Sequence, residues 1–189
     1  AVINGIPDWV NEEEFSIATS LCFTADGSQI CWIKYDETDV PTYDLQLFMG
    51  ASQTRDEYSD YPGLYSYKYP KAGQTNATVS AWSFDVKTKK TEKLQLPLDS
   101  DGYICRILPT ADPLKVLYVT LNRHQDKMDI YAVNPRSTLS QLVIHEEVKK
   151  YVVEAAYTDL CVTDNHILML SDRDGFRHLY LYTMNGTLK

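Results

Sequence analysis

Short runs in which apolar and polar residues alternate follow one another along most of the chain's 189 residues. A period of two is the pattern of a β-strand that has one buried face. The clearest case is a hairpin in which residues 20–24 and 29–35 flank the turn at Asp26 and Gly27. Turn-forming residues separate the later runs as well. The pattern predicts further strands at residues 79–84, 93–96, 104–108, 116–121, 128–133, 141–145, 159–163, 167–171 and 178–184.

These strands form three loose copies of a four-stranded meander, the repeat that is typical of β-propeller blades. The copy at 103–147 has the usual length of a blade, about 40–50 residues. The copy at 18–98 is longer because residues 36–78 are inserted, and the copy at 157–189 stops short. We therefore expect an all-β fold, a partial β-propeller of four-stranded antiparallel blades. So few blades cannot close a ring, which predicts a truncated chain or processing fragment with exposed edge strands.

The alternation is interrupted at residues 1–17, where we predict the one short helix of the chain, from about Trp9 to Phe15. Pro7 suits the approach to a helix, and Asp8 can cap its free N–H groups. Three glutamates follow in the helix, and adjacent ones differ in direction by about 100°, so a neighbouring pair can flank one pocket. An ammonium group has three donors and can bridge two such carboxylates. Simple solvation of the acidic side chains is the alternative that the residues alone leave open.

Composition excludes some classes of function. Hydrophobic residues make up 44% of the chain, which is enough for a core, and the net charge of −8 argues against a nucleic-acid partner. No apolar run approaches the roughly 20 residues of a membrane helix, so no membrane contact is predicted. Neither the cysteines nor the histidines have the spacing of a zinc site. We predict no metal and no cofactor.

The cysteines and arginines are the remaining candidates for chemistry. Cys22 and Cys31 lie equidistant from the hairpin turn, which allows either a disulfide or two small buried side chains. Cys105 and Cys161 have no evident partner and are predicted to be free and buried. The sequence does not place any arginine at a pocket, although four could bind a peptide carbonyl or carboxylate: Arg106, Arg123, Arg136 and Arg177. No G-x-S-x-G sequence for a hydrolase nucleophile occurs in the chain.

Residues 4–15, N-G-I-P-D-W-V-N-E-E-E-F, resemble the stretch N-G-I-P-D-W-V-Y-E-E-E of the dipeptidyl peptidase IV family. In that family the stretch lies in a β-propeller domain that precedes an α/β-hydrolase domain. Two stretches make the chain most similar to bacterial members, L-N-R-H at 121–124 and N-P-R-S-T at 134–138. Further matches follow in the family's order: T-A-D-G at 24–27, D-E-T-D-V-P at 36–41, Y-P-K-A-G at 69–73 and D-R-D-G-F-R-H-L-Y at 172–180.

The resemblance implies a serine exopeptidase that releases N-terminal dipeptides with proline or alanine in second position. The second and third glutamates of the family's triple hold the substrate's free ammonium, which assigns that role to Glu13 and Glu14 and leaves Glu12 as a supporting residue. Asn11 departs from the family's usual tyrosine. The Ser-Asp-His triad is expected in a C-terminal α/β-hydrolase domain of the parent chain. No catalytic residue is expected here, and this chain alone should be inactive.

The inserted segment 36–78 is rich in tyrosine and carries three prolines. In the family the equivalent stretch extends from a blade and takes part in homodimer contacts, whereas a loop packed on its own propeller is the alternative. The resemblance also implies a periplasmic or secreted protein whose partners are peptides with a free N-terminus. Other functions stay open: an inactive relative, a tripeptidyl peptidase, a non-catalytic scaffold for protein–protein interaction, or a carbohydrate-binding or lyase-type propeller.

Overall fold

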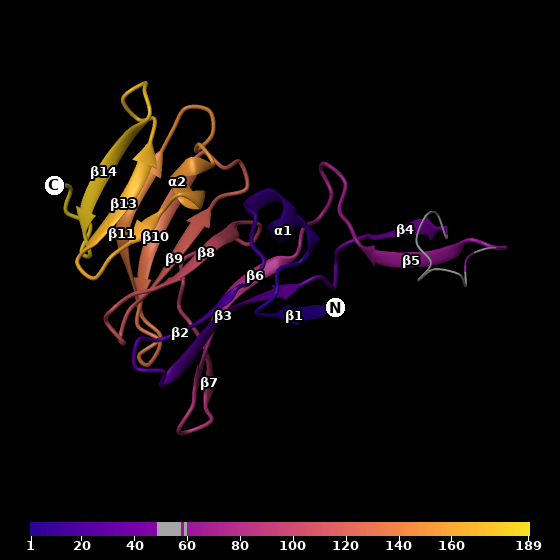
Figure 1. Cartoon of the computed structure of the whole chain (residues 1–189), viewed down its shortest axis with the longest axis horizontal. Coiled ribbons are helices and arrows are strands. Elements are labelled where there is room, and N and C mark those ends of the chain that lie inside the picture. The colour runs from indigo at the N-terminus through magenta and orange to yellow at the C-terminus, as the bar shows by residue number, and fades with distance from the viewer. Residues whose placement is uncertain (49–57, 59) are drawn as a thin grey trace.

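The structure is a computed structural model that describes residues 1–48, 58 and 60–189. Its described part is built almost entirely from antiparallel strands (Figure 1). Neither of the helices in this part is both long and apolar enough to cross a membrane. In chain order the elements are β1 (Val2–Asn4), α1 (Trp9–Phe15), β2 (Leu21–Phe23), β3 (Gln29–Asp36), β4 (Thr42–Leu47), β5 (Gly63–Lys68), β6 (Thr78–Asp85), β7 (Thr91–Lys93), β8 (Tyr103–Pro109), β9 (Val116–Leu121), β10 (Lys127–Val133), β11 (Ser140–Glu147), α2 (Ala155–Thr158), β12 (Cys161–Val162), β13 (His166–Ser171) and β14 (His178–Thr183).

The first sheet is the meander β2-β3-β6-β7, and it gains β1 beside the far end of β3. Val2 lies opposite Asp36 and Asn4 opposite Lys34 in this added pairing. The prediction lacks β1, because three residues are too few to show an alternating pattern. The predicted strands at 20–24, 29–35 and 79–84 are confirmed, whereas β7 begins two residues before the predicted 93–96. Its register with β6 is fixed by the tight turn that joins the two strands.

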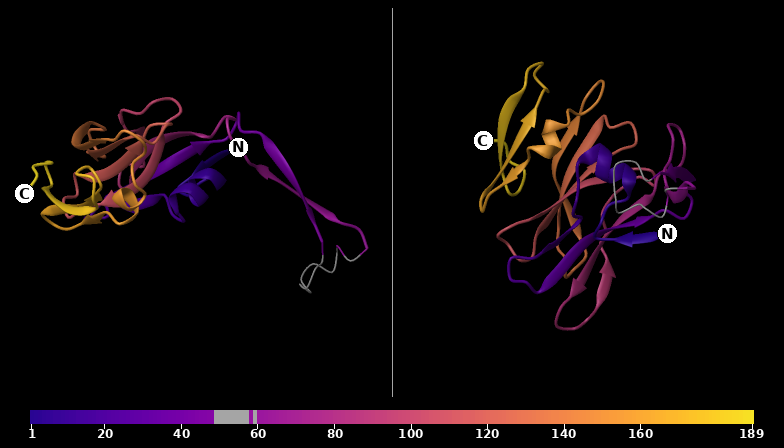
Figure 2. Two further views of the ribbon diagram at one scale, coloured as in Figure 1. Left: turned by 90° about the horizontal axis from the view of Figure 1, so that it is seen from above. Right: turned by 45° about the vertical axis from the view of Figure 1, so that its right-hand side comes forward.

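The second sheet, β11-β10-β9-β8, separates two hydrophobic clusters. Every residue of β9 is buried, as expected for a strand with both faces covered. Leu117 and Val119 contact the cluster shared with β13, whereas Val116 and Tyr118 contact the cluster shared with β3. The sheets therefore pack face to face in sequence order, as propeller blades do (Figure 2).

The third sheet, β12-β13-β14, follows the short helix α2. The expectation that helix is confined to the opening segment is therefore wrong. Ala156 and Tyr157 of α2 are buried in the cluster between the second and third sheets. A helix of four residues shows no repeating apolar pattern in the sequence. Its position depends on the packing of Tyr157 against Phe15, which lies more than a hundred residues earlier in the chain.

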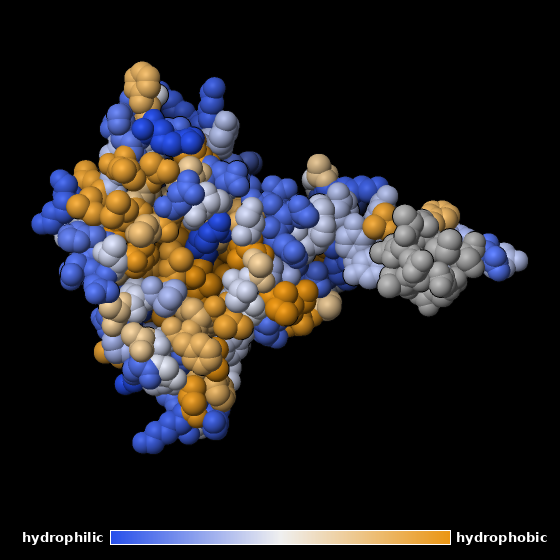
Figure 3. All heavy atoms as spheres, in the orientation of Figure 1, coloured by the Kyte–Doolittle hydropathy of each residue, from blue (hydrophilic) through white to orange (hydrophobic). Residues whose placement is uncertain are grey.

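Cys161 is exposed, so the prediction that it is buried is wrong, whereas the prediction for Cys105 is confirmed. Cys161 lies opposite Leu168 on the neighbouring strand, and Leu168 lies opposite Leu181. Because side chains alternate between the faces of a sheet, these three share the outer face. On the face shown in Figure 3, apolar side chains gather over this third sheet.

Cys22 and Cys31 lie directly opposite each other on β2 and β3, as the hairpin predicts, and both are free thiols. The neighbouring pairs exchange backbone hydrogen bonds, from Thr24 N–H to the Gln29 oxygen and from Ile33 N–H to the Ser20 oxygen. The register makes Cys22 and Cys31 a hydrogen-bonded pair as well, and side chains of such pairs lie farther apart. This wider spacing disfavours a disulfide, which needs β-carbons about 3.8 Å apart.

Strands β4 and β5 pair along their whole length and form a hairpin that projects away from the three packed sheets (Figures 1 and 2). The hairpin lies within the predicted arm 36–78. Residues 49–57 and 59 of that arm lie outside the described residues. The strands have little buried surface, with Leu64 65% and Tyr65 55% exposed.

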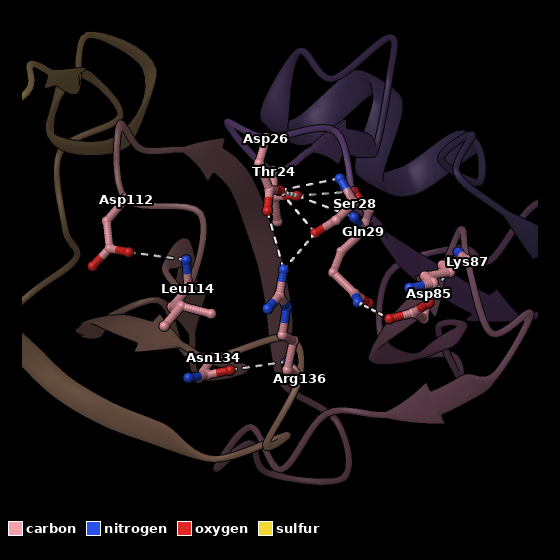
Figure 4. Close-up of polar contacts among 10 residues, drawn as sticks. All are labelled: Thr24, Asp26, Ser28, Gln29, Asp85, Lys87, Asp112, Leu114, Asn134 and Arg136. Atoms are coloured by element: carbon pink, nitrogen blue, oxygen red, sulfur yellow. Dashed lines mark hydrogen bonds and ion pairs between the residues drawn. The ribbon is translucent and has the colours of Figure 1, made fainter.

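The turn between β10 and β11 links the second sheet to the first (Figure 4). Arg136 Nη2 lies 3.0 Å from both the Asp26 carboxylate and the Ser28 hydroxyl in the β2–β3 turn. The Ser83 hydroxyl of β6 donates to the carbonyl oxygen of Pro135 at 2.9 Å. Polar contacts at the rim thus fix the relative position of the two sheets, whose shared core is apolar.

We predict a pH-dependent contribution of Asp26 to stability. Hydrogen bonds from Ser28 and Thr24, together with the charge of Arg136, lower the pKa of Asp26 from 3.8 to about 2. A lowered folded-state pKa gives stability that is complete above the unfolded value and is lost as the pH falls through the folded value. Asp26→Asn should therefore be less stable than the unchanged chain near neutral pH. This difference in stability should shrink as the pH falls from 3.8 to about 2. The difference is measured from the midpoints of urea unfolding across this pH range, with the exposed Asp39→Asn as the control. A difference that does not depend on pH would contradict the prediction.

Candidate functional site

Asp8 caps the N-terminus of the acidic helix α1, as predicted. One carboxylate oxygen of Asp8 accepts from the backbone N–H of Asn11 at 3.4 Å and from the Asn11 side-chain amide at 2.6 Å. The helix ends at Ser16, which adopts a left-handed conformation with φ 52°. Both ends of α1 are thus fixed by local conformation, and the segment from Trp9 to Phe15 is helical as predicted.

Asp8 and Asn11 are both buried, with exposed fractions of 3% and 1%. Burial raises the pKa of Asp8, and the hydrogen bonds from Asn11 offset only part of this effect. Asn11 stands where the family commonly has tyrosine, and its amide supplies the shorter of the two bonds to Asp8. Its own side-chain oxygen has no hydrogen-bond partner within the described part of the chain.

Phe15 anchors the C-terminal end of α1 in the core. Its side chain is fully buried and makes edge-on contacts with Tyr103 and Tyr157, at centroid distances of 5.2 Å and 5.8 Å. Its carbonyl oxygen accepts a hydrogen bond from Arg106 at 2.6 Å. A cation at this end also complements the helix dipole. Arg106 therefore stabilises the C-terminal end of α1.

A row of aromatic rings fixes the other end of α1. The Trp9 ring lies 4.1 Å from the Tyr69 ring, and Tyr69 in turn contacts Tyr43 and Tyr67 at 5.5 Å and 5.6 Å. Tyr67 stacks on Tyr65 at 5.5 Å. We call these five rings the aromatic row. It runs from α1 onto the β4–β5 hairpin, so helix and hairpin are in continuous contact.

The three glutamates of α1 are all exposed, but the structure places them differently. Glu14 lines an open pocket of about 380 Å³, whereas Glu12 and Glu13 are not part of its lining. The pocket is formed where α1, the loop that follows β5, and the β9–β10 turn meet. Its lining residues are Trp9, Val10, Glu14, Tyr69, Pro70, Lys71, Ala72, Asn76, Tyr103, Arg123 and Gln125.

Arg123 is the arginine that the structure brings to this pocket, and the sequence does not single it out. Its Nη1 donates to the Tyr103 hydroxyl at 2.9 Å, and its Nη2 donates to the backbone oxygen of Gln74 at 3.3 Å. The Asn76 amide donates to the same hydroxyl at 3.0 Å. Burial raises the pKa of Tyr103, and the charge of Arg123 offsets part of that. More than a hundred residues separate Arg123 from Glu14, so no spacing rule connects them.

The pocket offers an anionic group, aromatic walls and two cations, which suits a charged organic ligand rather than a metal. In the residues that the structure describes, no three His, Cys, Asp or Glu side chains are grouped to hold a metal ion. The other candidate arginines lie elsewhere: Arg136 links two sheets, and Arg177 pairs with Asp172 at 3.1 Å.

Comparison with known proteins identifies the family of the chain. The family model described as "Dipeptidyl peptidase IV (DPP IV) N-terminal region" matches residues 1–189. The chain belongs to the dipeptidyl peptidase IV family. The crystal structure of Porphyromonas gingivalis dipeptidyl peptidase 4 superposes with a TM-score of 0.91 at 35% identity, covering 100% of this chain and 26% of that one. The predicted all-β fold, a partial propeller of four-stranded blades, is thereby confirmed.

Curated relatives in the dipeptidyl peptidase IV family cover the same region. The probable dipeptidyl peptidase 4 of Aspergillus flavus is 27% identical over 98% of the chain and 25% of its own length. The probable dipeptidyl-aminopeptidase B of Emericella nidulans is 32% identical over 77% of the chain and 17% of its length. The chain therefore spans about a quarter or less of the relatives that it matches.

The cap of α1 gives a testable prediction. Asp8→Ala removes the acceptor for Asn11 and should lower the free energy of unfolding by about 1 kcal/mol. Asp8→Asn keeps an acceptor oxygen and removes the buried charge. Because the folded-state pKa of Asp8 is raised above 3.8, the ionised group costs stability as the pH rises through it. Chemical denaturation near neutral pH should therefore rank Asp8→Asn at or above the unchanged chain and Asp8→Ala below it. Equal destabilisation by both changes would contradict this account.

Proposed function

We propose that this chain is the substrate-recognition part of a serine exopeptidase that removes dipeptides from the N-terminus of peptides. The second residue of the substrate is proline or alanine, and Glu13 and Glu14 bind the free ammonium at the N-terminus of the substrate. Membership of the family supports the class of reaction. One observation carries the site assignment: Glu14 lines a pocket and belongs to a helix that is anchored at both ends.

The proposed clamp depends on charge and on position. Glu13 and Glu14 are adjacent and exposed, and an ammonium has three donors to share between two carboxylates. Glu12 contributes negative charge as a supporting residue. Because Phe15 and Trp9 hold the helix in place, the ammonium is bound at a set position. A fixed amine lets the enzyme count residues from the N-terminus to the scissile bond.

The clamp also explains why blocked peptides would be rejected. An acylated amine has no charge and would leave desolvated carboxylates without a partner. The nucleophile, base, aspartate and oxyanion hole belong to an α/β-hydrolase domain of the full-length protein. This chain alone is then inactive, and the full-length protein acts in the periplasm or outside the cell.

Substitution of single glutamates in the full-length protein tests the assignment. Glu13→Gln or Glu14→Gln should each cost about 2–4 kcal/mol in kcat/KM, because each leaves one member of a desolvated charge pair without its partner. Glu92→Gln on β7, whose carboxylate pairs with Lys90 at 2.8 Å, is the control and should leave kcat/KM unchanged. The readout is hydrolysis of an alanyl-prolyl chromogenic substrate. Normal turnover by a Glu13→Gln, Glu14→Gln double variant would overturn the assignment.

We further propose that the arm, residues 36–78, joins two copies of the protein. A two-stranded hairpin is at best marginally stable in water without a surface to pack on. The β4–β5 hairpin projects from the packed sheets and exposes apolar side chains along both strands (Figure 1). Leu45, Leu64 and Tyr65 are 40%, 65% and 55% exposed. A second copy of the same hairpin would bury this surface.

The association state of the full-length protein tests this proposal. Leu64→Glu replaces the most exposed of these three side chains with a charge and should convert the dimer to a monomer. Leu139→Glu is the matched control, because Leu139 is 57% exposed in the β10–β11 turn, away from the hairpin. Sedimentation equilibrium measures both variants. A dimer that persists in Leu64→Glu, or a monomeric unchanged protein, would contradict the role of the arm.

A further inference from the structure

We propose that the pocket beside Glu14 receives the side chain of the substrate's first residue, and that Arg123 makes this pocket select an acidic side chain. The inference rests on the proposed function, since it takes the ammonium to be bound at Glu13 and Glu14. It adds a substrate preference and a residue that determines it.

The connectivity of a peptide leads to the pocket. The α-carbon that bears the ammonium carries two other heavy substituents, the backbone carbonyl carbon and the side chain. The backbone must continue toward a nucleophile that lies outside this chain. The side chain is then the group that can occupy the space next to the clamp, and Glu14 itself lines that space. Its volume of about 380 Å³ is within the usual range of small-molecule sites.

The walls of the pocket suit a side chain that has both methylene groups and a charged end. Trp9, Tyr69 and Tyr103 provide aromatic surface for the methylene groups. Glu14 is the one carboxylate of the lining, and the proposed function assigns it to the ammonium. The charges that remain on the lining are those of Lys71 and Arg123, both positive, in a chain whose net charge is −8.

Arg123 is held in place before any ligand binds. Its guanidinium donates to the Tyr103 hydroxyl and the Gln74 carbonyl oxygen, and lies 5.8 Å from the centroid of the Tyr103 ring. The turn that carries it is closed by Asn122, whose side chain accepts from the N–H groups of Asp126 and Lys127 at 3.1 Å and 3.0 Å. A guanidinium has five N–H donors, so some are left for a carboxylate. A fixed planar donor set matches a carboxylate better than a mobile ammonium does.

A first-residue glutamate satisfies these groups, because its methylene groups reach past the aromatic walls and its carboxylate accepts from Arg123. Glutamine has nearly the same shape but no charge, and lysine would bring a third positive charge to the lining. The expected order of kcat/KM is therefore glutamyl-prolyl above glutaminyl-prolyl above lysyl-prolyl substrates.

The test uses the full-length protein and compares glutamyl-prolyl with glutaminyl-prolyl chromogenic substrates, with alanyl-prolyl as the reference. Arg123→Gln should lower the glutamyl to glutaminyl ratio of kcat/KM by about tenfold, as expected for loss of a charge-assisted hydrogen bond. Alanyl-prolyl cleavage should fall less than glutamyl-prolyl cleavage, because alanine has no carboxylate for Arg123 to bind. Arg123→Lys keeps the charge and should retain part of the preference. Arg177→Gln, which removes an exposed arginine of the β13–β14 turn, should leave the ratio unchanged.

The outcomes separate this inference from the proposed function. An unchanged protein that cleaves alanyl-prolyl substrate but does not prefer glutamyl over glutaminyl overturns the inference alone. So does an Arg123→Gln variant that loses activity equally on all three substrates, because that result assigns Arg123 to stability. Failure of the unchanged protein to cleave any of the free-amine substrates overturns the proposed function, and the inference with it.

Discussion

The burial of Phe15 is the interaction on which the rest of the site depends. Its ring fills the cluster between the second and third sheets, where it contacts Tyr103 of β8 and Tyr157 of α2. Removing such a ring from a close-packed core typically costs about 3–5 kcal/mol. A helix of seven residues is too short to be stable on its own in water, so the core contact is what keeps α1 folded. The directions of the three glutamates that precede Phe15 follow from that contact.

The aromatic row gives the projecting hairpin a second role. Tyr69 follows β5 directly and contacts Trp9, so the base of the hairpin forms one wall of the pocket that Glu14 lines. Lys71 lies 5.3 Å from the Tyr43 ring centroid and also lines the pocket. The base of the hairpin and the first turn of α1 are therefore joined by direct ring contacts. In the proposed dimer, association and amine recognition would share the same set of rings.

Local patterns predict the parts of this structure that depend on neighbouring residues. Alternation locates the hairpin β2–β3 and the meander β8 to β11, because each of these strands has a face that must be apolar. Asp8 as a helix cap is equally local. The sequence does not reveal β1, α2 or the exposure of Cys161, since each depends on which distant element covers it. The sequence offers Arg123 only as one of four candidate arginines for the same reason: only the fold brings the β9–β10 turn to α1.

The central claim is that α1 carries a clamp for a free N-terminal amine. The most direct measurement is hydrolysis by the full-length protein of an alanyl-prolyl chromogenic substrate and of its N-acetylated twin, which differ in the charge that the clamp would bind. The account predicts cleavage of the free-amine form and none of the acetylated form. Cleavage of both at similar rates, or of neither, would contradict it and would leave the acidic helix without a role in substrate recognition.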